Sequence, residues 1–383
     1  MTRPRPEVFA IEPPPVWRYW AHRFAGAAWR RLRRLGPAVR FRAEGRRADL
    51  SFKLSDVEPS FDEIEAIVFH PRVLEAMETP PDAPLSLDLP APRLPTGFER
   101  LGWARRDRPA PVYDIVPLGL ELDVLELRLA ELEAVVDRFV VVECERSFSG
   151  IRKPLLLQRN WPRFERFRTR IDHVLIDPAP IDAAFPERVR RAMGIAGETP
   201  SRSAMWRRLR ESSFADDAIL ISADVDEIPS RNFVHLLRHF EPPGPLRLQA
   251  PALRYHFRLR DDEATNFIFV LRPKDLAFLD ERPDGFRAIP GPAMSCRGSS
   301  HLTSFLKPLG LVAKFAMAAE WSPPLVPFVR NEYDEVRTMM RRGHWFARPA
   351  QAYDAERDPE GLIPLAAQVN RERYRHFWAA SYP

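Results

Sequence analysis

Residues 218–229, AILISADVDEIP, decide the fold of this chain. Four apolar residues lead into a cluster of three carboxylates, Asp224, Asp226 and Glu227, and Pro229 then ends the run. A short apolar run that ends in a polar cluster is typical of a buried strand whose carboxyl end opens into a site. In open α/β sheets, ligands bind at that end of the strands. The stretch therefore predicts a central strand with a ligand site directly after it.

The two aspartates of this stretch have the spacing of a divalent-cation site. Asp224 and Asp226 alternate with Val225, so in extended backbone both side chains would point to the same side. Two converging carboxylates repel each other unless a cation neutralises them. Oxygen ligands suit Mg²⁺ or Mn²⁺, which are often shared with a substrate phosphate. The other interpretation is an acidic surface turn after a core strand.

Length and composition limit the classes of protein to consider. The chain has 383 residues, of which 45% are hydrophobic and 29% charged, as in a soluble globular protein with a large core. The net charge of +5 is mild for this length and does not indicate a nucleic-acid partner. Two cysteines, Cys144 and Cys296, make neither a zinc spacing nor a disulfide framework. No bilayer-length apolar run or secretory signal is recognised, so we expect a cytoplasmic protein.

Residues 1–110 read as an N-terminal extension. Residues 16–35 combine an aromatic and apolar stripe with arginines on the other side, which predicts a basic amphipathic helix. Such a helix could contact a membrane surface peripherally, or it could pack on its own domain, and the pattern does not decide between them. Residues 50–54 suggest a strand and residues 61–77 a helix. The Pro-dense stretch 79–111 is typical of a linker or a wrapping arm.

From Tyr113 onward, strand and helix patterns alternate, which predicts an α/β domain over residues 111–383. The alternation indicates a mainly parallel sheet flanked by helices, with right-handed crossovers. No glycine-rich phosphate-binding motif follows the first strand. The expected strands are residues 113–118, 138–143, 171–176, 218–221, 247–260 and 266–272. The expected helices are residues 121–134, 201–213, 311–319, 332–343 and 371–378, and residues 298–305 are expected to form a polar loop.

Several blocks of this domain, in order, resemble glycosyltransferase family 17. They are PLGLELDVLELRLAEL (117–132), FVVVECERSFSGIRKP (139–154), the basic segment 202–207, ADVDEIP (223–229), the segment 300–314, GHWF (343–346) and RYRHF (373–377). The resemblance implies a GT-A-like fold and an inverting transfer of a sugar, with N-acetylglucosamine the first candidate. It further implies a nucleotide-sugar donor and a glycan or lipid-linked acceptor. Serines at 203, 299 and 300 depart from the family pattern near the expected substrate contacts.

The resemblance also implies roles for the acidic residues. Departure of a nucleoside diphosphate develops negative charge, which a bridging metal stabilises. Asp226 is the first choice of metal ligand, and Asp224 would share the metal or accept a hydrogen bond from the ribose. Glu121 and Asp123 follow the first strand, where a GT-A fold places its nucleotide-binding loop, although Asp123 could equally cap a helix. Glu227 would point away from Asp226 and brace the loop.

For the diphosphate ligands and for the catalytic base, the sequence leaves several candidate residues. Lys314, Arg202 and Arg207 are candidates for binding the diphosphate, although the two arginines could also lie on a solvated helix face. An inverting displacement needs a base to accept the proton of the acceptor hydroxyl. The candidates for the base are His301, Glu320, Asp262 and Glu263. Glu143, at a strand end, is a further active-site candidate, whose alternative is a buried salt bridge with Arg128 or Lys153.

Three other classes of function compete with a glycosyltransferase. A metal-dependent phosphohydrolase could use the strand-end carboxylates, but it would want a Ser or Thr soon afterwards, where Ile228 and Pro229 stand. A calcium-binding loop would need a glycine that is absent here. A non-catalytic carbohydrate-binding or scaffold protein would keep the carboxylates without using them.

Overall fold

The structure is a computed structural model. It describes residues 8–11, 61–177, 202, 204–206, 209–212, 214–277, 291–317, 336–337, 340–341, 343–345 and 348–378. The predicted helix at 16–35 and the predicted strand at 50–54 lie outside the described residues, as do the site candidates Arg207 and Glu320. Asp262 and Glu263 are described only as part of a strand backbone.

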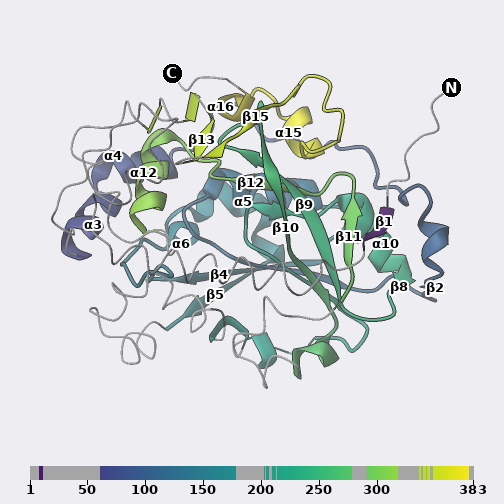
Figure 1. Cartoon of the computed structure of the whole chain (residues 1–383). Helices are drawn as coiled ribbons and strands as arrows, with labels where there is room; N and C mark the ends of the chain where they lie inside the picture. The colour runs from purple at the N-terminus through teal and green to yellow at the C-terminus, as the bar shows by residue number, and fades with distance from the viewer. Residues whose placement is uncertain are drawn as a thin grey trace, which may run out of the picture.

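A mixed sheet crosses the centre of the molecule, with strands in the order β1-β11-β9-β10-β6-β3-β4-β5 (Figure 1). These strands are β1 (Val8–Ile11), β3 (Val112–Pro117), β4 (Arg138–Cys144), β5 (Ile171–Ile176), β6 (Ile219–Ser222), β9 (Leu246–Arg254), β10 (Leu259–Leu271) and β11 (Ala293–Cys296). Off this path lie β7 (Glu227–Ile228), β12 (Ser300–Thr303) and β15 (Gln351–Ala352).

Four neighbouring strands, β6, β3, β4 and β5, form the parallel part of the sheet. Ile115 of β3 pairs with Ser222 of β6 on one side and with Val140 of β4 on the other, so β3 extends two residues beyond the end of β6. β3, β4 and β6 are largely apolar and buried, as expected of strands covered on both faces, whereas the edge strand β5 is mostly half-buried. The predicted α/β sheet flanked by helices is confirmed. On the other side of β6, β10 and then β9 extend the sheet in antiparallel pairing.

The helix after β3, α5 (Leu122–Leu132), is buried on every side. Its Leu125 and Leu129 belong to the same apolar cluster as residues of the parallel strands. Its Val124 and Leu127 belong to a second cluster, which contains the C-terminal segment. The helix is therefore sandwiched between the sheet and the end of the chain, and its polar side chains must find partners inside the protein.

The remaining helices cover the edges and faces of the sheet. They are α3 (Phe61–Val68), α4 (Pro71–Glu78), α6 (Leu156–Arg159), α10 (Arg231–His239), α12 (Pro308–Met317), α15 (Leu365–Val369) and α16 (Arg375–Trp378). In Figure 1, α3, α4 and α12 lie together on the left, and α10 lies on the right beside β8. Short 3₁₀ helices occupy Phe98–Leu101, Trp161–Arg170 and Pro273–Ala277. Two-stranded ribbons join β2 (Ala104–Arg105) to β8 (Phe240–Glu241), and β13 (His344–Trp345) to β14 (Arg348–Pro349).

Three predicted elements differ from the structure. The helix expected at 61–77 is two helices, because the ring of Pro71 interrupts helical hydrogen bonding and His70 caps the second helix. The strand expected at 247–260 is broken at Tyr255, whose φ is +65°. The polar loop expected at 298–305 contains strand β12, which pairs with both β7 and β9.

Residues 79–97 form an extended arm without helix or strand. Leu85, Leu87 and Leu89 pack partly buried against the two main apolar clusters. The main chain of Ser86 exchanges two hydrogen bonds with the side chain of Asn370 (2.6 and 2.9 Å). The arm is thus fixed to the C-terminal segment. Among the described residues, no helix has the length and apolar character needed to cross a membrane.

Candidate functional site

The candidate site lies where β3 and β6 end, at the point where the chain order in the sheet reverses. From β3 the parallel strands continue through β4 to β5 on one side, whereas β6 is the neighbour on the other side. The loops that leave such neighbouring strands diverge and open a crevice at their carboxyl ends. Residues 118–121 follow β3 and residues 223–226 follow β6. Two segments that the sequence predicted as ligand-binding therefore meet at the edge of the sheet where such a crevice is expected.

Strand β12 brings a third segment to the crevice. It pairs with β7, placing His301 opposite Glu227, and the main-chain N–H of Leu302 donates to the carbonyl of Asp226 at 2.7 Å. The predicted polar loop would have given His301 no fixed position. Because it lies in a strand, His301 is held beside the carboxylate loop.

Four of the predicted site residues, from four separate segments, meet at one point. Lys314 Nζ, from α12, lies 2.7 Å from Glu121 Oε1 and 3.3 Å from Asp226 Oδ2. His301 Nε2 lies 3.8 Å from Asp226 Oδ1. The Lys314 side chain is 27% exposed, so the cluster is not fully closed off from solvent. A ligand that enters the crevice can reach this cation.

The charge states of this cluster follow from burial and pairing. Burial raises the pKa of Glu121, but the charge of Lys314 and its hydrogen bond outweigh burial, and the net pKa is lowered. Burial likewise lowers the pKa of Lys314, but Glu121 and Asp226 raise it above its usual value. For His301, burial lowers the pKa more than Asp226 raises it. At neutral pH Lys314 is therefore an ammonium group, Glu121 a carboxylate and His301 a neutral imidazole.

Asp224 has a different partner from Asp226. Arg202 Nη2 donates to both of its carboxylate oxygens, at 2.8 and 3.2 Å. The buried guanidinium of Arg202 also stacks on Phe148, 5.0 Å from the ring centroid. Asp224 keeps a third of its side chain exposed. Asp224 and Arg202 thus form a second ion pair in the carboxylate loop.

The carboxylate loop is not extended, as the sequence analysis assumed. The N–H of Glu227 donates to the carbonyl of Asp224 at 3.0 Å, which closes a turn through residues 225–226. The turn replaces the extended backbone that was assumed, and Asp224 and Asp226 have different partners within it. Glu227 braces the loop, as predicted, by accepting the Asp224 N–H at 3.1 Å.

Glu227 is an acid of the site whose pKa is strongly raised. Its side chain is buried, and burial together with the charges of Asp224 and Asp226 raises its pKa to about 8. At neutral pH this carboxyl group is therefore mainly protonated. The loop carries two negative charges instead of three.

Sequence reasoning missed Arg128, whose side chain sets the shape of the carboxylate loop. It is fully buried and donates to both oxygens of Asp114, at 2.7 Å each. Its Nη1 also donates to the carbonyls of Asp224 (3.1 Å), Val225 (3.4 Å) and Glu227 (2.7 Å). An arginine on the buried helix after β3 was the available signal, since a buried guanidinium must find several acceptors.

Lys153 plays a similar part on the other loop. Its ammonium group is buried and donates to the carbonyl of Gly119 at 3.4 Å, which supports the segment before Glu121. Burial lowers the pKa of Lys153 more than Glu143, Cys144 and Glu121 raise it. The loops after β3 and β6 are thus each held by a buried cation from another part of the chain.

Two predicted site residues are engaged in contacts of another kind. The carboxylate of Glu143 accepts from the first-turn amides of α6, Leu157 (3.1 Å) and Gln158 (3.4 Å), and from His173 Nε2 (2.8 Å). This arrangement gives Glu143 a structural contact with α6 and β5, not the salt bridge with Arg128 or Lys153 that was its alternative.

Asp123 is likewise held inside the fold. It lies 2.7 Å from Arg163 and 3.0 Å from His376. Burial raises its pKa, but Arg163 and His376 together outweigh burial and lower it. Asp123 therefore joins α5 to the segment before β5 and to the C-terminal helix, and it is ionised across the physiological range.

As the side chains lie, the carboxylates do not form a ready divalent-cation site. In the part of the chain that the structure describes, no three His, Cys, Asp or Glu side chains are grouped so that they could hold a metal ion. Lys314 occupies one oxygen of Asp226, and Arg202 takes both oxygens of Asp224. A cation would have to displace these side chains before it could bind.

Comparison with known proteins agrees with the sequence blocks. Residues 96–266 match the sequence model of glycosyltransferase family 17. The Rattus norvegicus protein named beta-1,4-mannosyl-glycoprotein 4-beta-N-acetylglucosaminyltransferase is 32% identical over 144 residues, covering 36% of this chain and 25% of that protein. The Homo sapiens protein of the same name matches with the same identity and coverage. The alignment thus spans about a quarter of the length of these relatives.

A solved structure, 4-diphosphocytidyl-2C-methyl-D-erythritol synthase from Anaerococcus prevotii, shares 10% identity with a TM-score of 0.32, covering 53% of this chain and 96% of that one.

The region 96–266 that matches the family model contains Glu121, Asp224 and Asp226 together with the buried Arg128 that positions their loop. Over residues 96–266 this chain therefore matches glycosyltransferase family 17, and the resemblance drawn from the sequence blocks is confirmed.

Proposed function

We propose that the protein is a glycosyltransferase that moves a sugar from a nucleotide-diphosphate donor to a hydroxyl acceptor. One observation carries the proposal: Glu121, Asp226, Lys314 and His301 meet at the switch point of the sheet. The carboxylates of this cluster lie in the region that matches family 17. Transfer from such a donor needs cations for the diphosphate, acceptors for the nucleoside and a base, and the crevice offers all three.

Lys314 and Arg202 are the proposed diphosphate ligands. Each now neutralises a carboxylate of the loop, and Lys314 is partly exposed. A bound diphosphate would attract Lys314 away from Asp226 and Glu121, since phosphate oxygens carry more charge and offer more acceptors. This leaves Glu121 and Asp224 to accept hydrogen bonds from the hydroxyl groups of the nucleoside. The positive charge is thereby brought to the group on which negative charge develops.

His301 is the base candidate that the geometry favours. Its imidazole is neutral at neutral pH, and Asp226 lies 3.8 Å away, where it would stabilise the imidazolium formed on accepting a proton. Its buried Nδ1 has no hydrogen-bond partner among the described residues. Nothing in the described structure fixes one tautomer, so either nitrogen could accept the acceptor's proton.

A divalent cation remains a proposal. Mg²⁺ or Mn²⁺ would be held by Asp226, with Asp224 as second ligand, once Lys314 and Arg202 had turned to the diphosphate. When bound, such an ion would supply further charge neutralisation at the leaving group. We expect transfer to be stimulated by Mn²⁺ after removal of metal with EDTA. Equal rates of transfer with EDTA and with Mn²⁺ would contradict a role for the metal, and Lys314 and Arg202 alone would then neutralise the diphosphate.

N-acetylglucosamine is the first sugar to test, because the relatives are named as N-acetylglucosaminyltransferases. The acceptor would be a glycan or a lipid-linked precursor. Peripheral contact with a membrane through residues 16–35, and a location in the cytoplasm, belong to the same proposal.

The deciding experiment is a screen of UDP- and GDP-sugars by thermal shift and by release of the nucleoside diphosphate. We expect one donor to raise the melting temperature of the full chain and to be turned over. Asp226→Asn should abolish turnover. Glu356→Asn, which removes a carboxylate from the exposed surface, is the control and should leave turnover unchanged. Binding of glycans without turnover of any donor would instead favour a carbohydrate-binding protein.

A further inference from the structure

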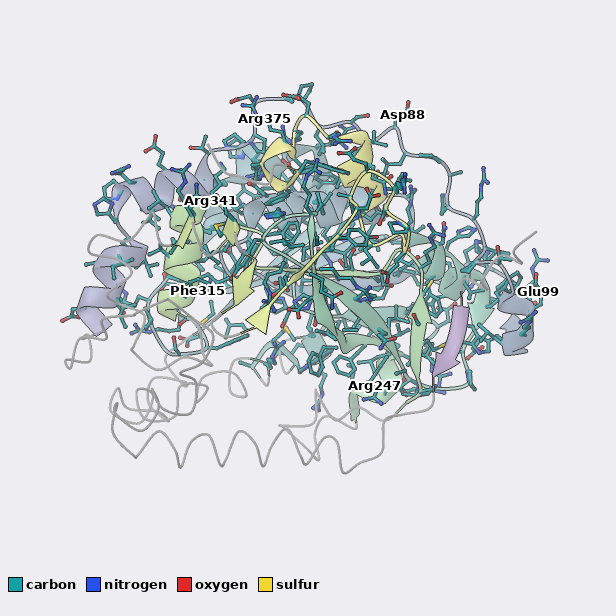
Figure 2. All side chains as sticks on the ribbon, turned by 45° about the horizontal axis from the view of Figure 1, so that its top comes forward. Asp88, Glu99, Arg247, Phe315, Arg341 and Arg375 are labelled. Atoms are coloured by element: carbon teal, nitrogen blue, oxygen red, sulfur yellow. The ribbon has the colours of Figure 1, made fainter. Side chains whose placement is uncertain are left out.

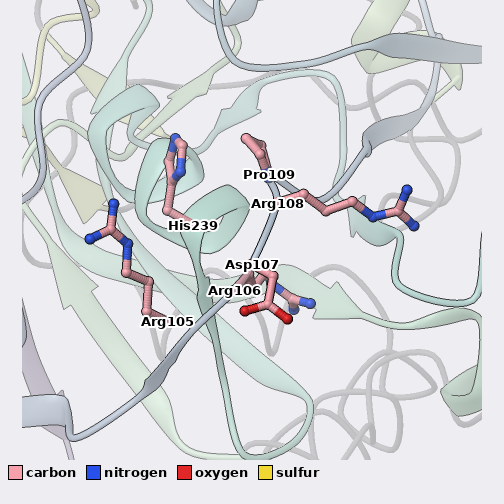
Figure 3. Close-up of a pocket in the computed structure, with 6 residues that line it drawn as sticks. All are labelled: Arg105, Arg106, Asp107, Arg108, Pro109 and His239. Carbon is pink, nitrogen blue, oxygen red and sulfur yellow. The ribbon is translucent and has the colours of Figure 1, made fainter.

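A cavity of about 470 Å³ lies at the opposite end of the parallel strands from the candidate site. It is lined by residues 105–109 and His239 (Figure 3). Residues 105–109 precede β3, whereas Glu121 follows β3, so the strand separates the two sites along the sheet. With about 3.3 Å per residue, a strand of this length keeps them roughly 20 Å apart.

The wall of this cavity is an arch over the C-terminal end of α10. The arch is tied down at both ends: the N–H of Arg106 donates to the carbonyl of His239, and the N–H of Ala110 to that of Arg238, each at 2.8 Å. Unpaired carbonyls at a helix C-terminus repel anions. Here the arch occupies two of them, which weakens this repulsion.

The lining of the cavity carries three guanidinium groups, of Arg105, Arg106 and Arg108, and one carboxylate, of Asp107. Arg108 also forms an ion pair with Asp217 at 3.1 Å, outside the lining. Arg105, Asp107 and Arg108 are exposed, so their side chains can turn toward or away from a ligand. Burial lowers the pKa of His239, and the charges of Arg238 and Arg105 lower it further. The local potential is therefore positive at the cavity.

Arg106 is the residue that points to a ligand. Its side chain is only 9% exposed and lines the cavity, yet its Nε and Nη2 have no hydrogen-bond partner among the described residues. The nearest carboxylate, Glu241, lies 3.9 Å from its Nη1 and is closer to Arg272, at 3.0 Å. A buried guanidinium with unsatisfied donors is costly unless an anion fills them.

We propose that this cavity binds a phosphate group, as a free ion or as part of a larger phosphate ester. The planar fork of arginine matches phosphate oxygens with two parallel hydrogen bonds, and a turn of the Arg106 side chain would bring its two buried, unpartnered donors to a phosphate in the cavity. Arg105 and Arg108 supply the remaining charge from the rim. The volume exceeds that of one phosphate group, so there is room for the group to which the phosphate is esterified. This site is independent of the proposed transferase reaction.

The test is calorimetric titration of the full chain with inorganic phosphate at low ionic strength. Wild type should bind phosphate at one site on the arch, and Arg106→Gln should weaken that binding roughly tenfold or more. Arg375→Gln is the matched control, because it removes the same charge from an exposed residue far across the molecule from Glu99 and the adjoining β2 (Figure 2). Lys314→Met should keep this binding, which distinguishes it from phosphate held in the candidate active site.

Vesicles separate the two sources of phosphate. Co-sedimentation with phosphatidylcholine vesicles, with and without phosphatidic acid, is compared for wild type and Arg106→Gln. A difference that depends on both phosphatidic acid and Arg106 identifies a lipid headgroup; phosphate binding without such a difference identifies a soluble phosphate ester. If Arg106→Gln does not fold, the exposed double variant Arg105→Gln/Arg108→Gln replaces it. Absence of phosphate binding, or equal binding in wild type and the arch variants, overturns the proposal.

Discussion

At the scale of single residues, the candidate site is a set of charges whose pairing sets their protonation. Lys314 bridges Glu121 and Asp226, and His301 lies beside Asp226. Asp226, Lys314 and Glu121 were all predicted from the sequence, but Glu121 and Lys314 were expected to act separately. In the structure, the charge of Lys314 is neutralised by these two carboxylates.

Lys314→Met tests this arrangement. The variant removes the cation proposed to meet the diphosphate, and we expect transfer to fall about 100-fold, as when one charge-stabilising donor is lost. Lys314→Arg should retain part of the activity because it keeps the charge. The measurement is kcat/KM for the donor found in the screen. An unchanged kcat/KM in Lys314→Met would remove Lys314 from the donor site.

Glu227 makes the stability of the protein depend on pH. Its folded-state pKa is raised to about 8 by burial and by Asp224 and Asp226, above its ordinary value of 4.5. Below that ordinary value the carboxyl group is protonated in both states, so its full contribution to stability is present. As pH rises from about 4.5 to about 8, only the unfolded state releases its proton, and that contribution is lost.

We therefore expect Glu227→Gln, which imitates the protonated form, to lose this part of the pH dependence. In buffer with EDTA, the melting temperature of the variant relative to that of wild type should increase as the pH is raised from about 4.5 to 8. Glu356→Gln, at the surface, should follow the wild-type curve. Parallel curves for wild type and Glu227→Gln would mean that Glu227 is ionised in the folded protein.

At the scale of elements, the carboxylate loop is shaped by α5. Arg128 joins Asp114 of β3 to three carbonyls of the loop after β6, so two strands and a helix define the loop together. Rigid positioning of this kind keeps catalytic groups within a few tenths of an ångström of their working places. The helix itself was predicted from the sequence, but the prediction gave its arginine no role in the loop.

Removing Arg128 should cost both stability and activity. Arg128→Met leaves Asp114 as an unpaired buried carboxylate, which costs about 3–5 kcal/mol of unfolding free energy. Arg128→Met combined with Asp114→Leu removes both charges and should recover much of this stability. Activity should stay low in the double variant, because the three loop carbonyls still lack their donor. Urea unfolding and donor turnover measure the two effects.

Recovery of activity together with stability would contradict a positioning role. It would show that Arg128 and Asp114 serve the fold alone. Arg170→Met is the control. It removes an arginine that forms a salt bridge with Glu133 at the edge of the sheet, so it tests whether loss of any arginine–glutamate pair has the same effect.

At the scale of the whole molecule, the C-terminal segment and the arm at 79–97 close around α5. Arg373 donates to both oxygens of Glu126 in α5, at 2.7 Å each, and also to the main-chain carbonyls of Pro81 and Ala83. Asp88 of the arm and Arg375 of α16 lie along the same edge of the molecule (Figure 2). One side chain thus joins three distant parts of the chain.

Arg373→Ala should loosen this closure. The loss of several hydrogen bonds around the buried Glu126 should destabilise the protein by about 2 kcal/mol. Hydrogen exchange of residues 80–90 should rise more than that of β3 or β6, because the arm is held mainly by such contacts. Arg375→Ala, whose pairs are exposed, should change neither quantity. Uniform faster exchange over the whole chain would show that Arg373 supports global stability only.

The sequence by itself determined the parallel strands, the buried helix after the first of them and the carboxylates at the end of β6. These features are local, since strand and helix periods and a strand-end acidic cluster are read from neighbouring residues. Tertiary structure alone decided that Lys314 meets Glu121, that Arg128 holds the carboxylate loop, and that Glu143 and Asp123 are engaged in structural contacts. Such contacts join residues far apart in the chain, and only the order and register of the strands bring them together.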